Sequence, residues 1–341
     1  MKTIIIKKPG QCEIIETKKP VRKKGEALLK VLYGGICGSD LGTYRGTFAY
    51  ASYPRIPGHE FSAKILEIDD NDKGLKPGMI VTCNPYFNDG TCYSCQRGLL
   101  NCCEHNETMG AQRDGAFSEY ITMPIERIYD GKGLPANILT LIEPFCISYH
   151  GVSRAHVKPG DKVLIVGAGT IGVLAAVAAK AAGGEVYISD VAEKKMNYAV
   201  KTFGLAGGIL NDNPENFWQK VKEVTNGNLF DVTIEAVGLP ATFQTCIDAA
   251  TFGGRMVQIG VGKKKVDFDF TLLQKKELNV FGSRNALKKD FLELIDLTKS
   301  GKANIEKVVT NTYDFDDAPK AFKDFSEHAA DMLRVVIKFP Q

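Results

Sequence analysis

The sequence predicts an α/β protein that combines a β-rich domain with a doubly wound parallel sheet. Residues 1 to about 128 alternate short β-type runs with turns rich in Pro, Gly and Lys, as antiparallel strands do. From residue 162 onward, strand-like apolar runs alternate with helix-compatible runs, which is typical of a parallel sheet covered by helices on both faces. The first of these later strands runs directly into three glycines with the spacing G-x-G-x-x-G.

Each expected element is a short run of apolar or β-branched residues, or a periodic helical run, between turn signals. The strands expected in the first part are Thr3–Ile6, Glu13–Glu16, Glu26–Tyr33, Phe61–Ile68 and Met79–Cys83. Those expected in the second part are Val163–Val166, Val186–Ser189, Val232–Ala236, Met256–Ile259 and Leu278–Phe281. Helices at Asp290–Ser300 and Ala318–Ala329 and a last strand at Arg334–Phe339 are expected near the C-terminus. Near residue 150 the pattern changes from short β-type runs to alternating strand-like and helix-like runs. This change divides the chain into residues 1–148, 149–284 and a C-terminal return, 285–341.

Composition excludes several other classes of protein. With 341 residues, 44% hydrophobic and 24% charged, the chain is typical of a globular protein of two domains. The net charge is +3 and the basic block Lys263–Lys265 reads as a solvated loop, so no nucleic-acid partner is expected. We expect no signal peptide and no membrane span. Nine cysteines then indicate thiolate metal chemistry in a reducing cytoplasm.

The glycine motif predicts a site for the pyrophosphate of a dinucleotide. Gly167 allows a tight turn, Gly169 allows the phosphates to approach the backbone, and Gly172 allows the helix to pack on the strand. Asp190 ends the next strand about twenty residues later, where a carboxylate binds the ribose hydroxyls and favours NAD over NADP, although Lys194 follows closely. The alternative is a glycine-rich turn in an unrelated α/β protein. The predicted cofactor-binding residues are Gly167, Gly169, Thr170, Ile171, Gly172, Asp190, Lys195, Val237 and Ile259.

A first group of metal-binding residue types is scattered over the β-rich part. It comprises Cys37, the pair His59 and Glu60, and Glu143 much later in the chain. Cysteine, histidine and carboxylate form a mixed set suited to zinc, and three protein ligands with one open position are typical of a catalytic site. Each residue alone is weak support, since single Cys and His residues are usually structural.

A second group is compact in the sequence, in a lobe at about residues 84–106. Cys92, Cys95 and Cys103 resemble a structural zinc site, which requires four ligands. Asp89, three residues before Cys92, is the candidate for the fourth, and Cys102 is the alternative. A reduced cysteine cluster without metal is the other interpretation.

Several motifs, taken together and in this order, resemble the zinc-dependent medium-chain alcohol dehydrogenases over nearly the whole chain. They are Cys37-Gly-Ser-Asp, Pro57-Gly-His-Glu, the cysteine-rich lobe, Ile142-Glu-Pro and Gly167-Ala-Gly-Thr-Ile-Gly. Within that family the chain looks most like the polyol and sugar-acid branch. Four segments look most like the L-galactonate-type members of that branch: Tyr53-Pro-Arg-Ile-Pro-Gly-His-Glu, Gly115-Ala-Phe-Ser-Glu-Tyr, Ile142-Glu-Pro-Phe and Phe281-Gly-Ser-Arg-Asn-Ala.

The resemblance implies a GroES-like catalytic domain interrupted by a Rossmann domain that binds NAD. It also implies that Cys37 and His59, with Glu143 or Glu60, hold a catalytic zinc. It further implies that Asp89, Cys92, Cys95 and Cys103 hold a structural zinc, although the family pattern there has four cysteines. Homo-oligomers, dimers or tetramers, are implied as well.

The resemblance also assigns roles in the reaction. Ser39, two residues after Cys37, is expected to accept the proton of the alcohol and pass it outward. Many relatives end this proton relay in a histidine at the position of Gly42, so the relay here is expected to end differently. Asp40 is expected to orient a neighbouring group.

The expected substrate is a sugar acid. The group oxidised is a secondary hydroxyl, the one at C5 of an L-aldonate such as L-galactonate. Arg284 is the candidate for binding its carboxylate, and the other substrate candidates are Asn285, Glu119 and Tyr50. The alternatives are a polyol or sugar-phosphate dehydrogenase of the sorbitol or galactitol-1-phosphate type, and an L-threonine 3-dehydrogenase. A zinc-free quinone reductase or a non-catalytic relative is disfavoured because Cys37, His59 and Glu143 are all present.

Overall fold

The computed structural model describes residues 1–340, which form two compact units. The first comprises Met1–Glu143, Leu287–Lys299 and the chain from Val309 onward, and the second comprises Pro144–Ala286 and Ser300–Val308. The expected C-terminal return, 285–341, is therefore shared between the units. One reason is visible in the second unit, where the hydroxyl of Tyr198 donates a hydrogen bond to the carbonyl of Lys307 at 2.8 Å.

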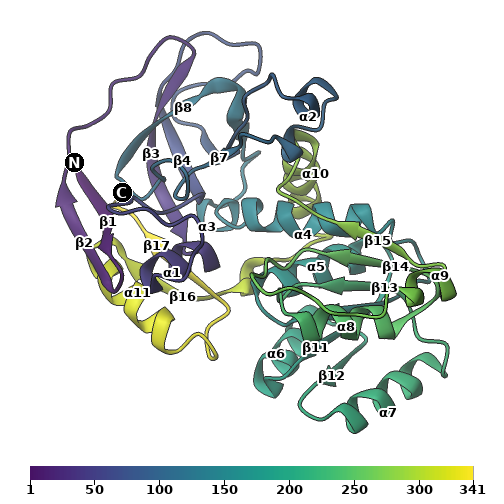
Figure 1. Cartoon of the computed structure of the whole chain (residues 1–341). Coiled ribbons are helices and arrows are strands. Elements are labelled where there is room, and N and C mark those ends of the chain that lie inside the picture. Colours follow the sequence, from purple (N-terminus) through teal and green to yellow (C-terminus); the bar gives the residue numbers. More distant parts are fainter. Residues whose placement is uncertain (341) are drawn as a thin grey trace. The chain divides into compact units, whose positions relative to one another are not determined.

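The first unit is built on a seven-stranded sheet that is largely antiparallel (Figure 1). Its strand order is β16-β17-β3-β4-β5-β9, and β8 also pairs with β3. Strand β3 lies at the centre and reads as a nearly continuous apolar run because it is buried on both faces. The seven strands are β3 (Glu26–Gly35), β4 (Glu60–Glu67), β5 (Ile80–Cys83), β8 (Tyr120–Pro124), β9 (Ile128–Asp130), β16 (Val309–Asp314) and β17 (Arg334–Lys338).

Two hairpins and several helices complete this unit. The hairpins are β1 (Lys2–Lys8) with β2 (Gln11–Glu16), and β6 (Tyr86–Phe87) with β7 (Glu107–Thr108). The helices are α1 (Gly38–Arg45), α2 (Tyr93–Gln96), α3 (Ala136–Leu139), α10 (Lys288–Lys299) and α11 (Ala318–Glu327), with 3-10 turns at Leu100–Cys102, Ile125–Arg127 and Phe315–Asp317. At the core, the fully buried ring of Phe117 packs edge-to-face on Phe322 and Phe339.

The second unit contains a six-stranded sheet in which every neighbouring pair is parallel. Its order, β12-β11-β10-β13-β14-β15, reverses direction at β10, as in a doubly wound nucleotide-binding fold. The strands are β10 (Lys162–Val166), β11 (Glu185–Asp190), β12 (Gly207–Leu210), β13 (Phe230–Glu235), β14 (Ala250–Gln258) and β15 (Asn279–Gly282). The helices are α4 (Ile142–Arg154), which begins at the end of the first unit, α5 (Thr170–Ala181), α6 (Glu193–Phe203), α7 (Pro214–Thr225), α8 (Pro240–Ala249) and α9 (Thr271–Lys275), and a 3-10 turn follows at Glu306–Val308.

Six observed strands are not among those predicted from the sequence: β6, β7, β8, β9, β12 and β16. For β12 and β16 the reason lies in their position. Both lie at an edge of their sheet. Strand β12 begins with two glycines, and in β16 no residue is fully buried. Edge strands bury less apolar surface than central ones, so the sequence pattern that marks a strand is weak in both. In the described part of the chain, no helix combines the length and the apolar character needed to cross a membrane.

Candidate active site and metal centres

Three of the predicted zinc ligands converge in the first unit. The donor atoms of Cys37, His59 and Glu60 all lie within 4.8 Å of one another. Cys37 precedes α1 just after β3 ends, whereas His59 and Glu60 lie at the start of β4. The antiparallel register of these two strands pairs Gly35 with Glu60, so it is the sheet that brings the two segments together.

The chemistry of this donor set fits a zinc ion. Both carboxylate oxygens of Glu60 and Nδ1 of His59 are buried and form no hydrogen bond within the described residues, although one oxygen of Glu60 is ion-paired with Arg334 at 3.0 Å. Leaving such groups unsatisfied costs about 1–3 kcal/mol each, and more when they are charged. A cation held by thiolate, imidazole and carboxylate would satisfy them. Zinc in such a site, when bound, acts as a Lewis acid that makes a hydroxyl group easier to deprotonate.

Asp40 connects the two ligand segments, in agreement with the orienting role expected for it. One oxygen accepts a hydrogen bond from the amide of Cys37 at 3.0 Å, and the other accepts one from the amide of Gly58 at 3.0 Å. The second oxygen also lies 3.9 Å from Nδ1 of His59. Burial opposes protonation of the imidazole, but Cys37 and Asp40 outweigh it and raise the pKa of His59 well above its ordinary value.

Glu143 is buried beside this set but is bound differently. It lies in the first turn of α4 and accepts a hydrogen bond from the hydroxyl of Tyr86. Burial raises the pKa of Glu143 to about 7, and Glu60 adds to the rise although His59 acts against it. The group of donor atoms within 4.8 Å of one another contains Glu60 but not Glu143.

Arg334 is a site residue that the sequence reasoning missed. It begins β17, and only 3% of its side chain is exposed. One guanidinium nitrogen lies 3.0 Å from a carboxylate oxygen of Glu60 and donates a hydrogen bond to the carbonyl of Ile36 at 2.7 Å. A buried cation is needed here because a thiolate and two carboxylates carry more negative charge than one zinc ion balances. The sequence held no local signal for this role, since Ile36 is 298 positions away.

The relay candidate Ser39 lies in the first turn of α1, and its carbonyl accepts a hydrogen bond from the hydroxyl of Thr43 at 3.0 Å. Gly42 lies one turn further along the helix. A side chain at this position would place its Cβ only 3.2 Å from Cβ of Phe48. A histidine at position 42 would therefore require Phe48 to move.

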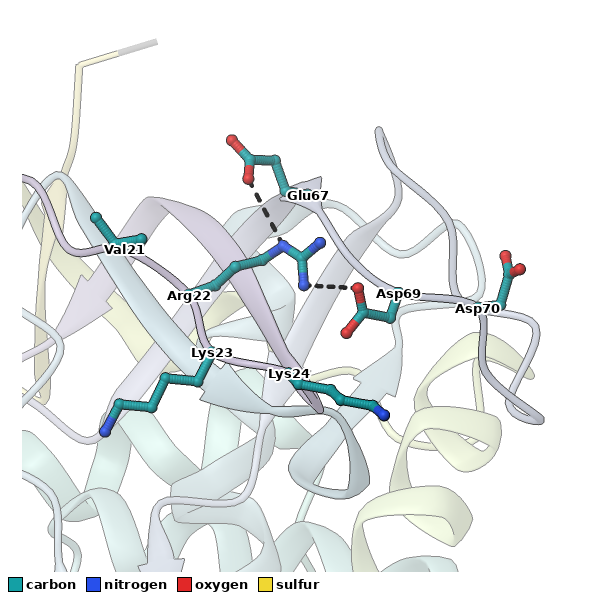
Figure 2. Close-up of a pocket in the computed structure, with 7 residues that line it drawn as sticks. All are labelled: Val21, Arg22, Lys23, Lys24, Glu67, Asp69 and Asp70. Atoms are coloured by element: carbon teal, nitrogen blue, oxygen red, sulfur yellow. Dashed lines mark ion pairs between the residues drawn. The ribbon is translucent and has the colours of Figure 1, made fainter.

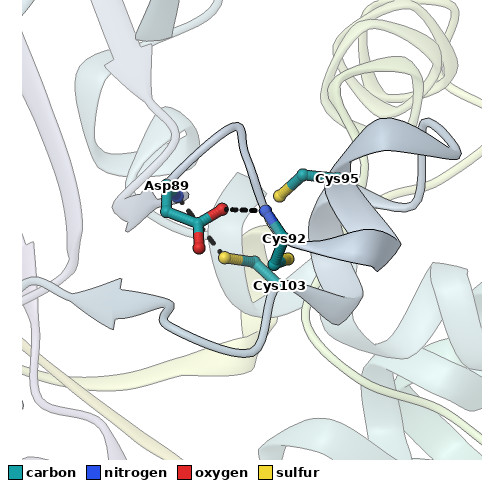
Figure 3. Close-up of side chains that lie close together, drawn as sticks. All are labelled: Asp89, Cys92, Cys95 and Cys103. Carbon is teal, nitrogen blue, oxygen red and sulfur yellow. Dashed lines mark hydrogen bonds between the residues drawn. The ribbon is translucent and has the colours of Figure 1, made fainter.

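The cysteine-rich lobe brings four donors together (Figure 3). Side chains of Asp89, Cys92, Cys95 and Cys103 lie within 4.8 Å of one another, and Cys102 is outside this group. One oxygen of Asp89 accepts hydrogen bonds from the amides of Thr91 and Cys92 at 2.9 and 3.0 Å. The amide of Cys92 and the side chain of His105 hold the pKa of Asp89 well below its usual range, so the carboxylate stays ionised as a metal ligand must. Three thiolates and a carboxylate fit a structural zinc.

We expect Asp89→Ala to lower the zinc content from two ions per chain to one. The change removes a ligand and the acceptor that shapes the loop, so the lobe should lose at least about tenfold in zinc affinity. Metal analysis of the dialysed protein, with titration against a chromophoric chelator, measures both quantities. Cys102→Ser is the matched control and should retain both ions. If Cys102→Ser loses one ion and Asp89→Ala does not, Cys102 is the fourth ligand instead.

The glycine motif forms the turn between β10 and α5 in the second unit. Gly167 has φ +109°, which favours glycine, and a Cβ on Gly172 would lie 1.8 Å from the carbonyl oxygen of Gly167. A Cβ on Gly169 would meet no atom within 4 Å, which leaves space for a phosphate group. One oxygen of Asp190 accepts a hydrogen bond from the amide of Ala168 at 2.6 Å, so this carboxylate also holds the turn.

A second carboxylate that the sequence reasoning missed organises the neighbouring loops. Glu235 is fully buried at the end of β13. It accepts hydrogen bonds from the amides of Val237 and Gly238, at 3.0 and 2.8 Å, and from the side-chain amide of Gln258 at 2.6 Å. Of the other predicted cofactor residues, Val237 is 41% exposed and Ile259 is 6% exposed. Thr170 and Ile171 open α5, and Lys195 lies in the first turn of α6.

The substrate candidates are divided between the units. Tyr50 and Glu119 belong to the first, and Arg284 and Asn285 follow β15 in the second. Tyr50 is 64% exposed and its ring lies 5.6 Å from that of Phe48. Glu119 accepts a hydrogen bond from the backbone amide of Lys2 at 2.7 Å, so it anchors the first strand. Arg284 is exposed.

A surface hollow of about 600 Å³ in the first unit holds none of the predicted site residues (Figure 2). Arg22 spans it, with one nitrogen 2.7 Å from Asp69 and another 3.6 Å from Glu67. These ion pairs tie the turn before β3 to the end of β4. We assign the hollow a structural role.

Comparison with known proteins agrees with this geometry. The model of the alcohol dehydrogenase GroES-like domain matches residues 23–133, and that of the zinc-binding dehydrogenase matches residues 170–300. An uncharacterized zinc-type alcohol dehydrogenase-like protein of Haemophilus influenzae is 34% identical over 340 residues, 98% of each chain. L-galactonate-5-dehydrogenase of Escherichia coli K12 is 32% identical over 339 residues, 99% of each chain. The crystal structure of a short chain alcohol dehydrogenase (rspB) of Escherichia coli CFT073, complexed with NADH, is 30% identical and superposes with a TM-score of 0.91 over 99% of each chain.

The predicted fold class, a GroES-like domain with a Rossmann parallel sheet, is confirmed, as are zinc and NAD as the cofactors. The chain therefore belongs to the zinc-dependent medium-chain alcohol dehydrogenases, in their polyol and sugar-acid branch, and is an NAD-dependent oxidoreductase that acts on CH–OH groups.

Proposed function

We propose that the enzyme oxidises a secondary hydroxyl of a sugar acid, C5 of an L-aldonate such as L-galactonate, and transfers the hydride to NAD. The observation that carries the proposal is the donor set of Cys37, His59 and Glu60, in which the buried His59 and Glu60 present atoms without a hydrogen-bond partner; three such ligands leave one position of a tetrahedral zinc ion open. The choice of substrate is supported by the full-length similarity to L-galactonate-5-dehydrogenase of E. coli. Arg284, an exposed residue, carries a guanidinium, the group whose geometry suits bidentate binding of a carboxylate.

In this proposal Cys37, His59 and Glu60 hold the catalytic zinc and Glu143 lies beside them. Ser39 accepts the proton of the hydroxyl and passes it outward, because a serine alone is too weak a base to keep it. The glycine turn and Asp190 bind NAD, with Thr170, Ile171, Lys195, Val237 and Ile259 completing its site. Arg284 and Asn285 select the substrate and Tyr50 remains a further candidate, whereas Glu119 is left to its structural role at the amide of Lys2.

We expect the enzyme to prefer aldonates over the matching polyols by tenfold or more in kcat/KM, about 1.4 kcal/mol of transition-state preference. The measurement is the initial rate of NADH formation on L-galactonate against galactitol, and on L-gulonate or L-idonate against sorbitol. Arg284→Ala should erase the preference by lowering the aldonate rates alone. Lys288→Ala, which removes an exposed cation four positions away, is the control and should leave it intact.

Other results would redirect the assignment. If the polyols react faster, the enzyme belongs with the sorbitol type and Arg284 binds hydroxyls. If the enzyme oxidises galactitol-1-phosphate or L-threonine but neither the aldonates nor the polyols, it is a sugar-phosphate dehydrogenase or an L-threonine 3-dehydrogenase instead. If none of these compounds reacts, the substrate proposal falls while the zinc and NAD assignments remain.

We also propose that the chain forms a homo-oligomer, a dimer or tetramer, and acts in the cytoplasm. The edge strand β15, with Val280 40% exposed, offers an unpaired apolar edge, and none of the nine cysteines is paired in a disulfide. Light scattering tests the assembly, since a particle of one 37.3 kDa chain would overturn it. Fractionation of the source cells tests the location.

A further inference from the structure

Two buried carboxylates lie where one zinc ligand is needed. The side chains of Glu60 and Glu143 are both at most 3% exposed. Glu60 belongs to the same group of donor atoms as His59, and the charge of Glu143 acts on His59. If both glutamates joined Cys37 and His59 as ligands, zinc would have four protein ligands. A structural site is closed in this way, but a catalytic site requires an open position for the substrate. One glutamate must therefore be kept out of the ligand set.

The contacts of the two glutamates differ in a way that selects between them. Glu60 belongs to the group of donor atoms within 4.8 Å, and its oxygens form no hydrogen bond within the described residues, although one of them is ion-paired with Arg334. Glu143 instead accepts a hydrogen bond from the hydroxyl of Tyr86, a residue that is 4% exposed. A buried carboxylate that gave up this bond to reach the metal would leave the phenol without it, at a cost of about 1–3 kcal/mol.

We propose that Tyr86 is a positioning residue that holds Glu143 outside the zinc ligand set, so that Glu60 is the carboxylate ligand and one coordination position stays open. The inference rests on the zinc site proposed above and deepens it. Tyr86 acts only through Glu143, because its hydroxyl donates a hydrogen bond to Oε1 of that residue.

Tyr86 can hold Glu143 because its own backbone is fixed. It lies in β6, which pairs with β7, and its amide donates a hydrogen bond to the side chain of Asn84 at 2.9 Å. Its carbonyl accepts a hydrogen bond from the guanidinium of Arg127. The ring centroid of the next residue, Phe87, lies 3.6 Å from the guanidinium carbon of Arg113 and 4.5 Å from that of Arg127. The backbone of Tyr86 is thus held by contacts outside the site that its hydroxyl serves.

The test replaces zinc by cobalt(II), whose visible absorption reports the number of ligands. We expect Tyr86→Phe to free Glu143, which then enters the ligand set and changes the intensity and position of the cobalt bands. Because the open position is lost, KM for the substrate should rise about tenfold, with a smaller change in kcat. Adding Glu143→Gln to Tyr86→Phe should restore both the spectrum and KM.

Tyr313→Phe is the matched control. Its hydroxyl donates to Asp324 at 2.9 Å in the same unit, so the change also removes a phenol–carboxylate bond, but one that contacts none of the ligands. It should leave the spectrum and KM unchanged. If Tyr86→Phe gives the wild-type spectrum and KM, the positioning role is overturned.

A second measurement decides the matter if Tyr86→Phe does not fold. Glu143→Ala should keep cobalt in the catalytic site, whereas Glu60→Ala should release it. Loss of cobalt in Glu143→Ala with retention in Glu60→Ala overturns the inference, because Glu143 would then be the ligand. A wild-type protein that takes up cobalt in the lobe alone would instead refute the zinc site proposed above.

Discussion

We expect Cys37→Ser to remove the catalytic zinc and to lower kcat/KM by about a thousandfold or more, since a Lewis acid contributes several kcal/mol to stabilising the transition state. Serine is favoured at the position just before the first residue of a helix, and Cys37 occupies this position before α1. We therefore expect α1 to form in the variant. The neutral hydroxyl of serine is a poor zinc ligand compared with a thiolate. The fold should therefore persist while the metal is lost.

Metal analysis and the initial rate of NADH formation check this expectation. The zinc content should fall from two ions per chain to one, the remaining ion being that of the lobe. Cys12→Ala is the control, because Cys12 is a buried cysteine of the same unit outside both donor groups, and it should retain both ions and full activity. A Cys37→Ser protein that keeps two ions would contradict the assignment of Cys37 as a ligand.

Two alanine substitutions in the glycine turn should have opposite signatures. Gly172→Ala places a Cβ 1.8 Å from the carbonyl oxygen of Gly167, and neither group belongs to a flexible side chain. We expect the free energy of unfolding to fall by about 3 kcal/mol, at the upper end of typical overpacking costs, and NAD binding to be lost with the distorted turn.

Gly169→Ala should leave stability unchanged but weaken NAD binding at least about tenfold. The added Cβ meets no protein atom within 4 Å, and φ of −76° suits alanine. The Cβ instead occupies the space that the pyrophosphate needs. Thermal unfolding and titration with NADH, followed by its fluorescence, separate the two effects. Normal NADH affinity in Gly169→Ala would refute the placement of the pyrophosphate at this turn.

Strand β10, which the sequence predicted, lies inside its sheet, whereas β12, which it did not predict, lies at an edge. Strand β10 is a run of buried apolar residues that ends in glycines, so its pattern is strong. Strand β12 contributes a single fully buried residue, Ile209, and its pattern is correspondingly weak. The strength of the local signal therefore follows the amount of apolar surface that a strand buries.

Features encoded within a few neighbouring residues could be determined from the sequence alone. The glycine turn and the cysteine lobe are of this kind, because a tight turn and a short loop depend on residues that are close in the chain. The spacing of Cys92, Cys95 and Cys103, with Asp89 before them, already predicted the four donors that lie together in Figure 3.

Only the tertiary structure revealed the groups that complete the catalytic site. Arg334 reaches Glu60 because β17 lies beside β3 in the sheet, and Tyr86 reaches Glu143 across 57 positions of the chain. Arginines and tyrosines occur throughout a protein of this size, and neither residue stands in a motif. Their roles follow from strand pairing and burial, which unite distant segments and oblige buried charges to find partners. The sequence by itself thus determined the fold class, the cofactors and the zinc-binding residue types, whereas the packing of the sheet decided which partners control them.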